Sequence, residues 1–136
     1  SKTNGIVVGL SGGIDSTLTA YLACEAVGPD NVFGIIMPST TTPAEDRIHG
    51  IRVAKHLGMD YKEIAIDSIL NEFLLKTQLE ENDLAIGNLK ARIRMSIIYY
   101  FANVFIGTFF RRIYLRFRHL VIHIVFLIVY KCGFIG

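Results

Sequence analysis

Residues 11–16, with the sequence SGGIDS, combine residue types that could bind phosphate. Two adjacent glycines, Gly12 and Gly13, let a backbone turn tightly and aim successive N–H groups into one concavity. The hydroxyls of Ser11 and Ser16 add further donors. The carboxylate of Asp15 would repel phosphate unless a cation lay between them, and Mg²⁺ prefers oxygen ligands that it shares with phosphates. The segment therefore predicts a phosphate-binding loop with Asp15 as a ligand of Mg²⁺.

The same loop departs from two common phosphate-binding patterns. It lacks the Gly-Lys-Ser/Thr of a Walker A loop and the G-x-G-x-x-G spacing of a Rossmann loop. No lysine lies close to it in the sequence, so backbone and hydroxyl groups would have to hold the phosphates. A glycine turn that only begins a helix is the alternative interpretation, and the two serines and the aspartate argue against it.

A second set of residues with chemical potential lies within residues 87–95, GNLKARIRM. On a helix, Lys90 and Arg94 are four positions apart and share one face, as do Asn88 and Arg92. Paired basic side chains suit a ligand with several anionic groups, because ammonium and guanidinium groups donate to phosphate and carboxylate oxygens. A solvated cationic helix face, without any ligand, remains the alternative interpretation.

Alternating strands and helices are expected to position these residues. Short apolar runs predict buried strands at residues 5–10, 32–37, 61–66 and 104–108. Apolar residues that recur every three or four positions predict helices at residues 16–28, 43–57, 67–79 and 87–103. This order indicates parallel strand pairing with right-handed crossovers, hence an α/β fold with a doubly wound parallel sheet. The loop at residues 11–16 then lies at the carboxyl end of the first strand, where open α/β sheets bind ligands.

The helix patterns also predict which side chains face the sheet. The three expected inner faces comprise Leu18, Leu22 and Ala26 in the first helix, Ile51, Ala54 and Leu57 in the second, and Ile69, Phe73 and Leu74 in the third. The second helix is expected to begin with a hydroxyl cap at Thr42 and with Pro43 in its first turn, and to end at Gly58.

Composition and charge narrow the class of protein. The chain has 136 residues, 51% of them hydrophobic and 19% charged, which excludes a disordered or collagen-like chain. Its two cysteines exclude a disulfide-dense scaffold and a four-cysteine zinc module. Residues 1–4 lead directly into an apolar run, so we expect no signal peptide and a cytoplasmic location. Every acidic residue lies at or before Asp83, so residues 84–136, with eight Lys and Arg, have a formal net charge of +8.

The motifs together resemble those of a known enzyme family. An apolar strand followed by SGGIDS resembles the signature of the PP-loop ATP pyrophosphatases, whose fold is that of the adenine nucleotide alpha hydrolases, similar to a Rossmann fold. The longer string GLSGGIDS, the MPS at residues 37–39 and above all GNLKARIRM resemble ammonia-dependent NAD synthetases over residues 5–103. The resemblance implies an ATP-dependent amidation of deamido-NAD with ammonia. It would pass through an adenylate and release AMP and pyrophosphate.

The resemblance also implies roles for individual residues, with ATP and Mg²⁺ as cofactors. The residues expected to bind ATP are Gly9, Ser11, Gly12, Gly13, Asp15, Ser16, Met37 and Thr108, and Asp15 would also bind the metal. Those expected to bind deamido-NAD are Asn88, Lys90, Arg92 and Arg94. No protein nucleophile is required. The resemblance further implies a homodimer, through an apolar face that contains Ile97, Ile98, Phe101 and Phe105, and a face that only packs in the core of the chain is the alternative interpretation.

The resemblance ends near Gly107-Thr108. No acidic residue follows, so the family's second metal carboxylate is missing, and we expect a divergent, degenerate tail at residues 104–136 beside a PP-loop domain at residues 1–103. Two alternatives to an NAD synthetase therefore stay open: a partial, inactive chain that only binds Mg–ATP, and another adenylating PP-loop enzyme of the GMP synthetase type. The apolar runs near the basic tail are shorter than a membrane span, and we expect neither a membrane nor a nucleic acid as partner.

Overall fold

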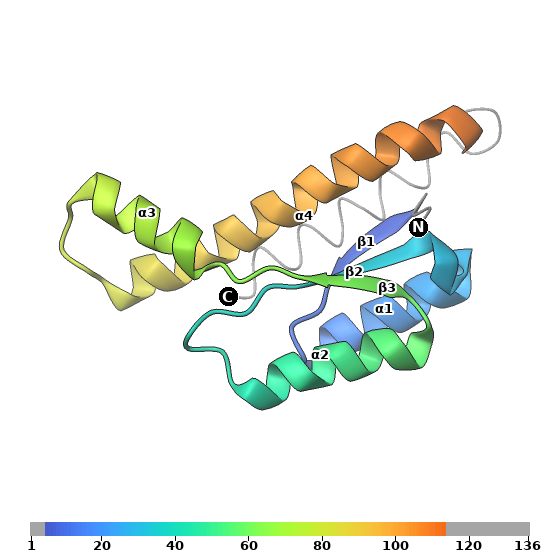
Figure 1. Cartoon of the computed structure of the whole chain (residues 1–136), viewed down its shortest axis with the longest axis horizontal. Helices are drawn as coiled ribbons and strands as arrows, with labels where there is room; N and C mark the ends of the chain where they lie inside the picture. The colour runs from blue at the N-terminus through green and yellow to red at the C-terminus, as the bar shows by residue number, and fades with distance from the viewer. Residues whose placement is uncertain (1–4, 114–136) are drawn as a thin grey trace.

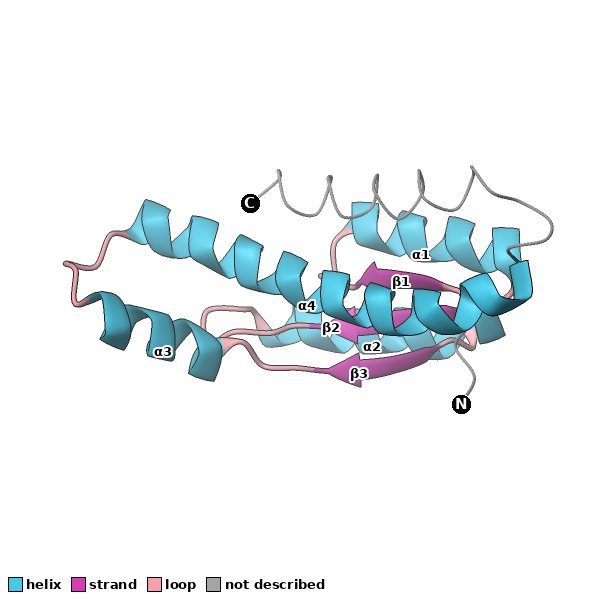
Figure 2. Ribbon diagram, turned by 90° about the horizontal axis from the view of Figure 1, so that it is seen from above, coloured by secondary structure: helices cyan, strands magenta, loops and turns pink. Residues whose placement is uncertain are grey.

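The computed structural model describes the backbone of residues 5–113 and the side chains of residues 5–105. Within that part, three parallel strands form one sheet in the order β1-β2-β3, with helices on both faces (Figures 1 and 2). The elements are β1 (Ile6–Gly9), α1 (Ile14–Val27), the 3₁₀ turn η1 (Pro29–Asn31), β2 (Val32–Ile36), α2 (Ala44–Leu57), β3 (Asp60–Glu63), α3 (Asp67–Thr77) and α4 (Asp83–Ile113). The predicted α/β fold with a parallel sheet is confirmed.

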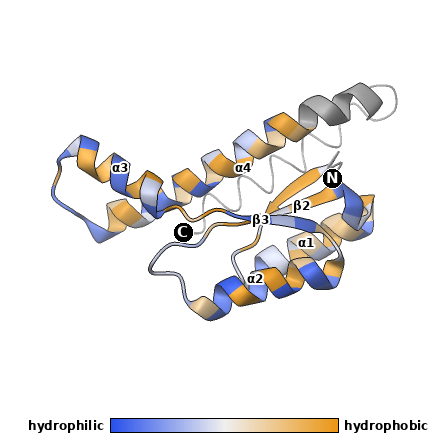
Figure 3. Cartoon of the chain, viewed as in Figure 1, coloured by the Kyte–Doolittle hydropathy of each residue, from blue (hydrophilic) through white to orange (hydrophobic). Residues whose placement is uncertain are grey.

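The sheet separates two apolar cores. Val8 and Ile36 face α1 and α2, whereas Val7 and Ile35, one residue away on the same strands, face α3 and α4. Successive strand residues point to opposite faces, and both faces are covered, as in other parallel sheets. The strands β1 and β2 are therefore hydrophobic, while the edge strand β3 is polar (Figure 3).

The third strand is shorter than predicted. β3 ends at Glu63 rather than at residue 66. The chain nevertheless stays alongside β2, because the Ile64 N–H donates to the Ile36 carbonyl at 2.8 Å and the Ile66 N–H donates to the Pro38 carbonyl at 3.0 Å. This extension brings the start of α3 beside the loop that follows β2.

The predicted inner face of the first helix is wrong. Leu18, Leu22 and Ala26 are exposed, with 55% of Leu18 accessible, and the buried residues of α1 are Ala20, Ala23 and Cys24. Small side chains let α1 approach the sheet closely, so the large ones lie on its outer face. Burial also raises the pKa of the Cys24 thiol, which keeps it protonated as a small hydrophobic group.

The second helix follows most of its prediction. Ala54 is buried, and Ile51 and Leu57 are partly buried against the same core. The predicted hydroxyl cap is wrong: no side chain caps α2, because the Thr42 hydroxyl instead accepts the Ser39 N–H at 3.0 Å. The helix ends at Gly58, as predicted.

Gly58 provides a test of backbone strain. Its φ is +71°, a left-handed conformation, and a Cβ added there would meet no atom within 4 Å. We expect Gly58→Ala to lower the free energy of unfolding by about 1 kcal/mol through backbone strain alone. Gly87→Ala is the matched control, because Gly87 is helical, lacks a positive φ and has equal space around it. The free energy of unfolding of this variant should rise by up to about 1 kcal/mol, because alanine favours a helix over glycine. Urea denaturation of both variants measures the difference, and a loss of stability in both would contradict it.

The third helix differs from its prediction at two positions. Leu70 is buried and Leu74 is partly buried, so Leu74 faces inward as predicted. Ile69 and Phe73 do not, because they are respectively 38% and 49% exposed. Both line the pocket between α3 and α4, since α3 extends beyond the carboxyl ends of the strands rather than over the sheet (Figures 1 and 2).

The predicted fourth strand at residues 104–108 is wrong, because α4 runs without a break from Asp83 to Ile113. Phe101 and Phe105 are four positions apart, and their rings lie 5.8 Å and 5.3 Å from the ring of Phe33, so continuing the helix packs both on β2. A short apolar run alone cannot distinguish a strand from a buried helix. Residue 103 therefore lies inside α4, and the boundary of a divergent tail stays a prediction, with residues 114–136 outside the described part of the chain.

Candidate functional site

The loop at residues 11–16 lies between β1 and α1, as predicted, and its serines hold it together. The Ser16 hydroxyl donates to the Gly13 carbonyl at 3.1 Å and accepts the Ser11 N–H at 3.2 Å. The Ser11 Oγ lies 3.1 Å from the Ser16 Oγ and accepts the Gly13 N–H at 3.3 Å. Both hydroxyls are thus used within the loop, and the donors available to a ligand are backbone N–H groups at the start of α1, which has no side-chain cap.

Gly12 has a conformation and a location that only glycine can adopt. Its φ is +85°, and a Cβ added there would overlap Asp46, lying 2.7 Å from the Asp46 Cα and 2.8 Å from its carbonyl carbon. The loop therefore rests directly on the backbone of α2. An α-helix start without a side-chain cap follows this contact, and its free N–H groups are donors that a phosphate group could accept.

Sequence reasoning missed one residue of this loop's surroundings, His49. Its Nδ1 lies 2.7 Å from the Gly12 carbonyl oxygen, across 37 positions of the sequence. Nothing in the spacing of an isolated histidine indicates such a contact, which depends on how α2 packs against the loop.

The carboxylate of Asp15 is exposed in the first turn of α1. Among the described residues, no group of three His, Cys, Asp or Glu side chains could hold a metal ion. Mg²⁺ at this loop would take one carboxylate from Asp15 and its other oxygens from phosphate and water, an arrangement that Mg²⁺ commonly has with nucleotides. The exposed carboxylate and the uncapped N–H groups at the start of α1 fit Mg–ATP in this way.

The helix α4 places two predicted basic residues at the carboxyl end of β2. The Arg94 Nε donates to the Met37 carbonyl at 3.0 Å, and the Lys90 Nζ donates to the Thr41 hydroxyl at 2.9 Å. Burial lowers the pKa of the Arg94 guanidinium, and the nearby carboxylate of Asp67 partly offsets this effect. Arg94 therefore joins α4 to the end of β2, and its charge lies near the carboxylate of Asp67, the first residue of α3.

The loop after β2 is fixed from the other side by the same carboxylate. Asp67 Oδ1 accepts the Thr40 N–H at 3.0 Å and the Thr40 hydroxyl at 3.3 Å. The loop is thus held by α3 through Asp67 and by α4 through Lys90 and Arg94. The Met37 side chain is only 8% exposed at this point, and its predicted contact with adenine stays a prediction.

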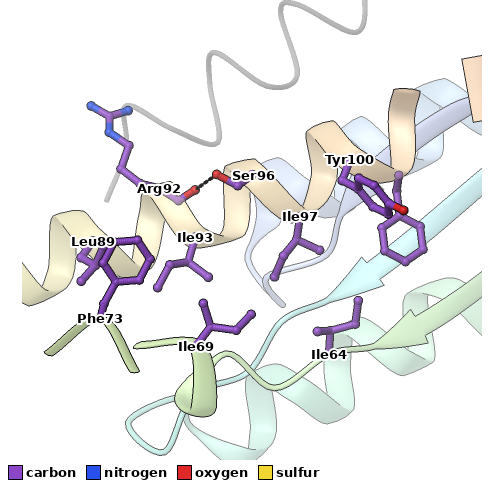
Figure 4. Close-up of a pocket in the computed structure, with 10 residues that line it drawn as sticks. Ile64, Ile69, Phe73, Leu89, Arg92, Ile93, Ser96, Ile97 and Tyr100 are labelled. Carbon is purple, nitrogen blue, oxygen red and sulfur yellow. Dashed lines mark hydrogen bonds between the residues drawn. The ribbon is translucent and has the colours of Figure 1, made fainter. Parts of the chain in front are cut away.

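The other predicted pair lies on a different face of α4. Asn88 and Arg92 are exposed, and Arg92 borders a pocket of about 360 Å³ between α3 and α4. The pocket walls are mainly apolar, and the Arg92 guanidinium points away from Ile64 and Ile69 toward solvent (Figure 4). The four residues expected to bind one dinucleotide therefore divide into an inner pair, Lys90 and Arg94, and an outer pair, Asn88 and Arg92.

Two further predicted ATP residues have other surroundings. Gly9 is buried in β1, where a Cβ would lie 2.8 Å from the Ile98 Cδ1, so its missing side chain lets α4 pack on the sheet. Thr108 lies inside α4 rather than at the end of a strand, and its side chain is outside the described part of the chain. The roles of both residues toward ATP stay predictions.

The predicted dimer face is largely used within the chain itself. Ile98 is buried, and Ile97, Phe101 and Phe105 are partly buried against the core beneath α4. No helix of the described residues has the length and hydropathy to cross a membrane.

Comparisons with known proteins agree with the motifs. A family model described as NAD synthase matches residues 1–108. The NH(3)-dependent NAD(+) synthetase of Methanococcoides burtonii is 50% identical over 105 residues, which are 74% of this chain and 39% of that protein. That of Methanocaldococcus jannaschii is 50% identical over 107 residues, which are 76% of this chain and 41% of that protein. The chain thus spans about two fifths of the length of these curated relatives.

Solved structures show the same similarity. The glutamine-dependent NAD+ synthetase from Acinetobacter baumannii, in complex with ADP, matches 76% of this chain and 20% of its own, with a TM-score of 0.72 and 32% identity. The NH3-dependent NAD synthetase from Campylobacter jejuni matches 76% of this chain and 44% of its own, with a TM-score of 0.68 and 38% identity. The residues 1–108 that the family model matches contain the loop at residues 11–16 and the basic residues Lys90, Arg92 and Arg94 of α4.

Proposed function

The chain belongs to the NAD synthase family, and from this premise we propose that it forms the amide of NAD from deamido-NAD, ATP and ammonia. The observation that supports the proposal is the geometry of the loop at residues 11–16: an uncapped helix start follows Gly12, whose contact with α2 leaves no space for a side chain. The substrates are ATP, deamido-NAD and ammonia.

The proposed reaction has two steps, and the residues act mainly by binding and orienting substrates. The carboxylate of deamido-NAD attacks the α-phosphate of ATP, which forms an acyl adenylate and releases pyrophosphate. Ammonia then attacks the acyl carbon, loses a proton and displaces AMP, which leaves the amide. Backbone N–H groups at the start of α1 would hold the phosphate chain, with Asp15 as the carboxylate for Mg²⁺, and Mg²⁺ would neutralise part of the phosphate charge. No side-chain nucleophile is needed in either step.

The two pairs of residues on α4 suggest different roles. Lys90 and Arg94 are bonded to the loop after β2, so we assign them to shaping the nucleotide side of the site. Asn88 and Arg92 are free to reach a ligand from solvent, and Arg92 borders an apolar pocket. We therefore assign these two to deamido-NAD, which combines aromatic rings with phosphates and a carboxylate.

A second candidate function is binding of Mg–ATP without turnover. One observation favours it: no acidic residue follows Asp83 in this sequence. The GMP synthetase alternative has less support, because the relatives and structures above carry the names of NAD synthetases. A homodimer and a cytoplasmic location also remain predictions.

An activity assay distinguishes these candidates. The purified chain is incubated with Mg–ATP, deamido-NAD and ammonium, and AMP and NAD are measured by mass spectrometry. We expect NAD to form and Asp15→Asn to slow its formation about a hundredfold, because the metal would lose its protein carboxylate. Mg–ATP binding without NAD would support the binding-only candidate. A folded chain that binds no Mg–ATP would contradict both.

A further inference from the structure

We propose that His49 is a positioning residue that holds the Gly12–Gly13 peptide in the orientation that a phosphate requires. The proposal deepens the proposed function, because it rests on the loop at residues 11–16 being the site of ATP phosphates. It concerns the side chain of α2 that lies 2.7 Å from the Gly12 carbonyl oxygen.

The hydrogen bond defines which ring nitrogen of His49 carries a proton. A carbonyl oxygen can only accept, so the Nδ1 must be the donor to Gly12. In its neutral form the ring must therefore be the tautomer protonated at Nδ1. The contact thus predicts a tautomer of His49 that can be measured directly.

The peptide between Gly12 and Gly13 is bonded at both of its ends. Its carbonyl accepts from His49 on α2, and its N–H donates to the Ser11 Oγ at 3.3 Å. A peptide flanked by two glycines reverses its direction more easily than any other, because neither residue has a Cβ. Reversal would turn the Gly12 carbonyl oxygen, with its partial negative charge, toward a phosphate held at the loop, and the negative phosphate oxygens would repel it. His49 opposes this reversal.

The surroundings show why α2 can do this. Gly12 rests on the backbone of Asp46, and a Cβ on Gly50 would lie 3.5 Å from the Leu10 carbonyl oxygen. Asp46, His49 and Gly50 are three and four positions apart and therefore share one face of α2, which lies against the loop. Asp46 and Gly50 bring the backbone of α2 against the chain at Leu10 and Gly12, and His49 supplies a directional hydrogen bond.

The His49 side chain is exposed, so its role can be separated from folding. His49→Leu removes the donor, whereas His49→Asn has nearly the same shape and can place an amide N–H where the Nδ1 lies. His56→Leu is a matched control, because His56 is also an exposed histidine of α2, one residue before its end. All three variants should keep a melting temperature within about 5 °C of the unmutated chain.

The first measurement needs no nucleotide. In a ¹⁵N-labelled unmutated chain at alkaline pH, long-range ¹H–¹⁵N spectra should show His49 as the neutral tautomer protonated at Nδ1. His49→Leu should accelerate amide hydrogen exchange of Gly13, which His49→Asn and His56→Leu should leave near its original rate. The Nε2-protonated tautomer, or unchanged exchange in His49→Leu, would overturn the proposal whether or not the chain binds ATP.

The second measurement connects the contact to the site. By calorimetry with Mg–ATP, we expect His49→Leu to weaken binding about tenfold and His49→Asn to stay within about threefold. Equal weakening in both variants would assign His49 a general packing role and overturn the proposal. A failure of the unmutated chain to bind Mg–ATP would count against the proposed function, while the tautomer and the exchange rates would still decide the orientation of the peptide.

Discussion

Replacing Gly12 by alanine is expected to abolish measurable Mg–ATP binding and to destabilise the fold. The φ of +85° costs a residue with a Cβ about 1 to 2 kcal/mol. The added Cβ would also overlap the Asp46 backbone, because it would lie 2.7 Å from the Asp46 Cα. A helix backbone cannot move aside as a flexible side chain does. We expect the free energy of unfolding to fall by about 2 to 4 kcal/mol in total. The loop would leave α2, and its N–H groups would no longer converge.

Gly13→Ala is the control for this effect. Gly13 has an extended backbone with a φ of −81°, and an added Cβ would meet only the Ser11 Oγ, at 3.4 Å. Urea denaturation should therefore show a loss below about 1 kcal/mol in this variant. The control is compared in stability alone, because Gly13 is itself expected to approach phosphate. Equal losses in both variants would mean that contact with α2 does not constrain Gly12. The loss of Mg–ATP binding is measured by calorimetry on Gly12→Ala and the unmutated chain.

The loop could be predicted because its properties are mainly properties of the backbone. A buried strand, two adjacent glycines and a following helix define where the chain turns and where N–H groups gather, whatever the remaining contacts are. The partners of the Ser11 and Ser16 hydroxyls could not be predicted from the sequence. Their hydroxyls were expected to face a ligand, yet they bond to each other and to the loop. Which partner a hydroxyl selects depends on distances that residue types do not contain.

The errors in the helices have a common physical cause. The spacing of Leu18 and Leu22 correctly indicates a helix, but a helix carries several stripes, and packing selected the one that contains Ala20 and Ala23. Periodicity describes one element, whereas burial depends on how closely two elements approach. The same holds for His49, whose contact with Gly12 joins two elements far apart in the sequence. Tertiary contacts of this kind are where a single sequence gives least information.

The division of α4 into an inner and an outer pair leads to the second large effect, at Arg94. Arg94→Met keeps much of the side-chain length but removes the donor to the Met37 carbonyl and the positive charge near Asp67. The Met37 carbonyl and the Asp67 carboxylate lie at the junction of β2, α3 and α4, where burial already lowers the pKa of the Arg94 guanidinium. We expect a loss of about 2 to 3 kcal/mol in the free energy of unfolding, measured by urea denaturation.

Arg92→Met is the matched control, two positions away on the outer face of α4. The methionine side chain can replace the aliphatic part of Arg92 at the border of the pocket between α3 and α4. The free energy of unfolding of this variant should therefore stay within about 0.5 kcal/mol of that of the unmutated chain. Its affinity for deamido-NAD should instead fall about tenfold, because a charged donor to the ligand is lost. The opposite result, a stable Arg94→Met that no longer binds deamido-NAD, would mean that the Arg94 guanidinium leaves Met37 to hold the substrate. Arg94 would then serve the role that the family motif implies, and its hydrogen bond to Met37 would belong only to the ligand-free protein.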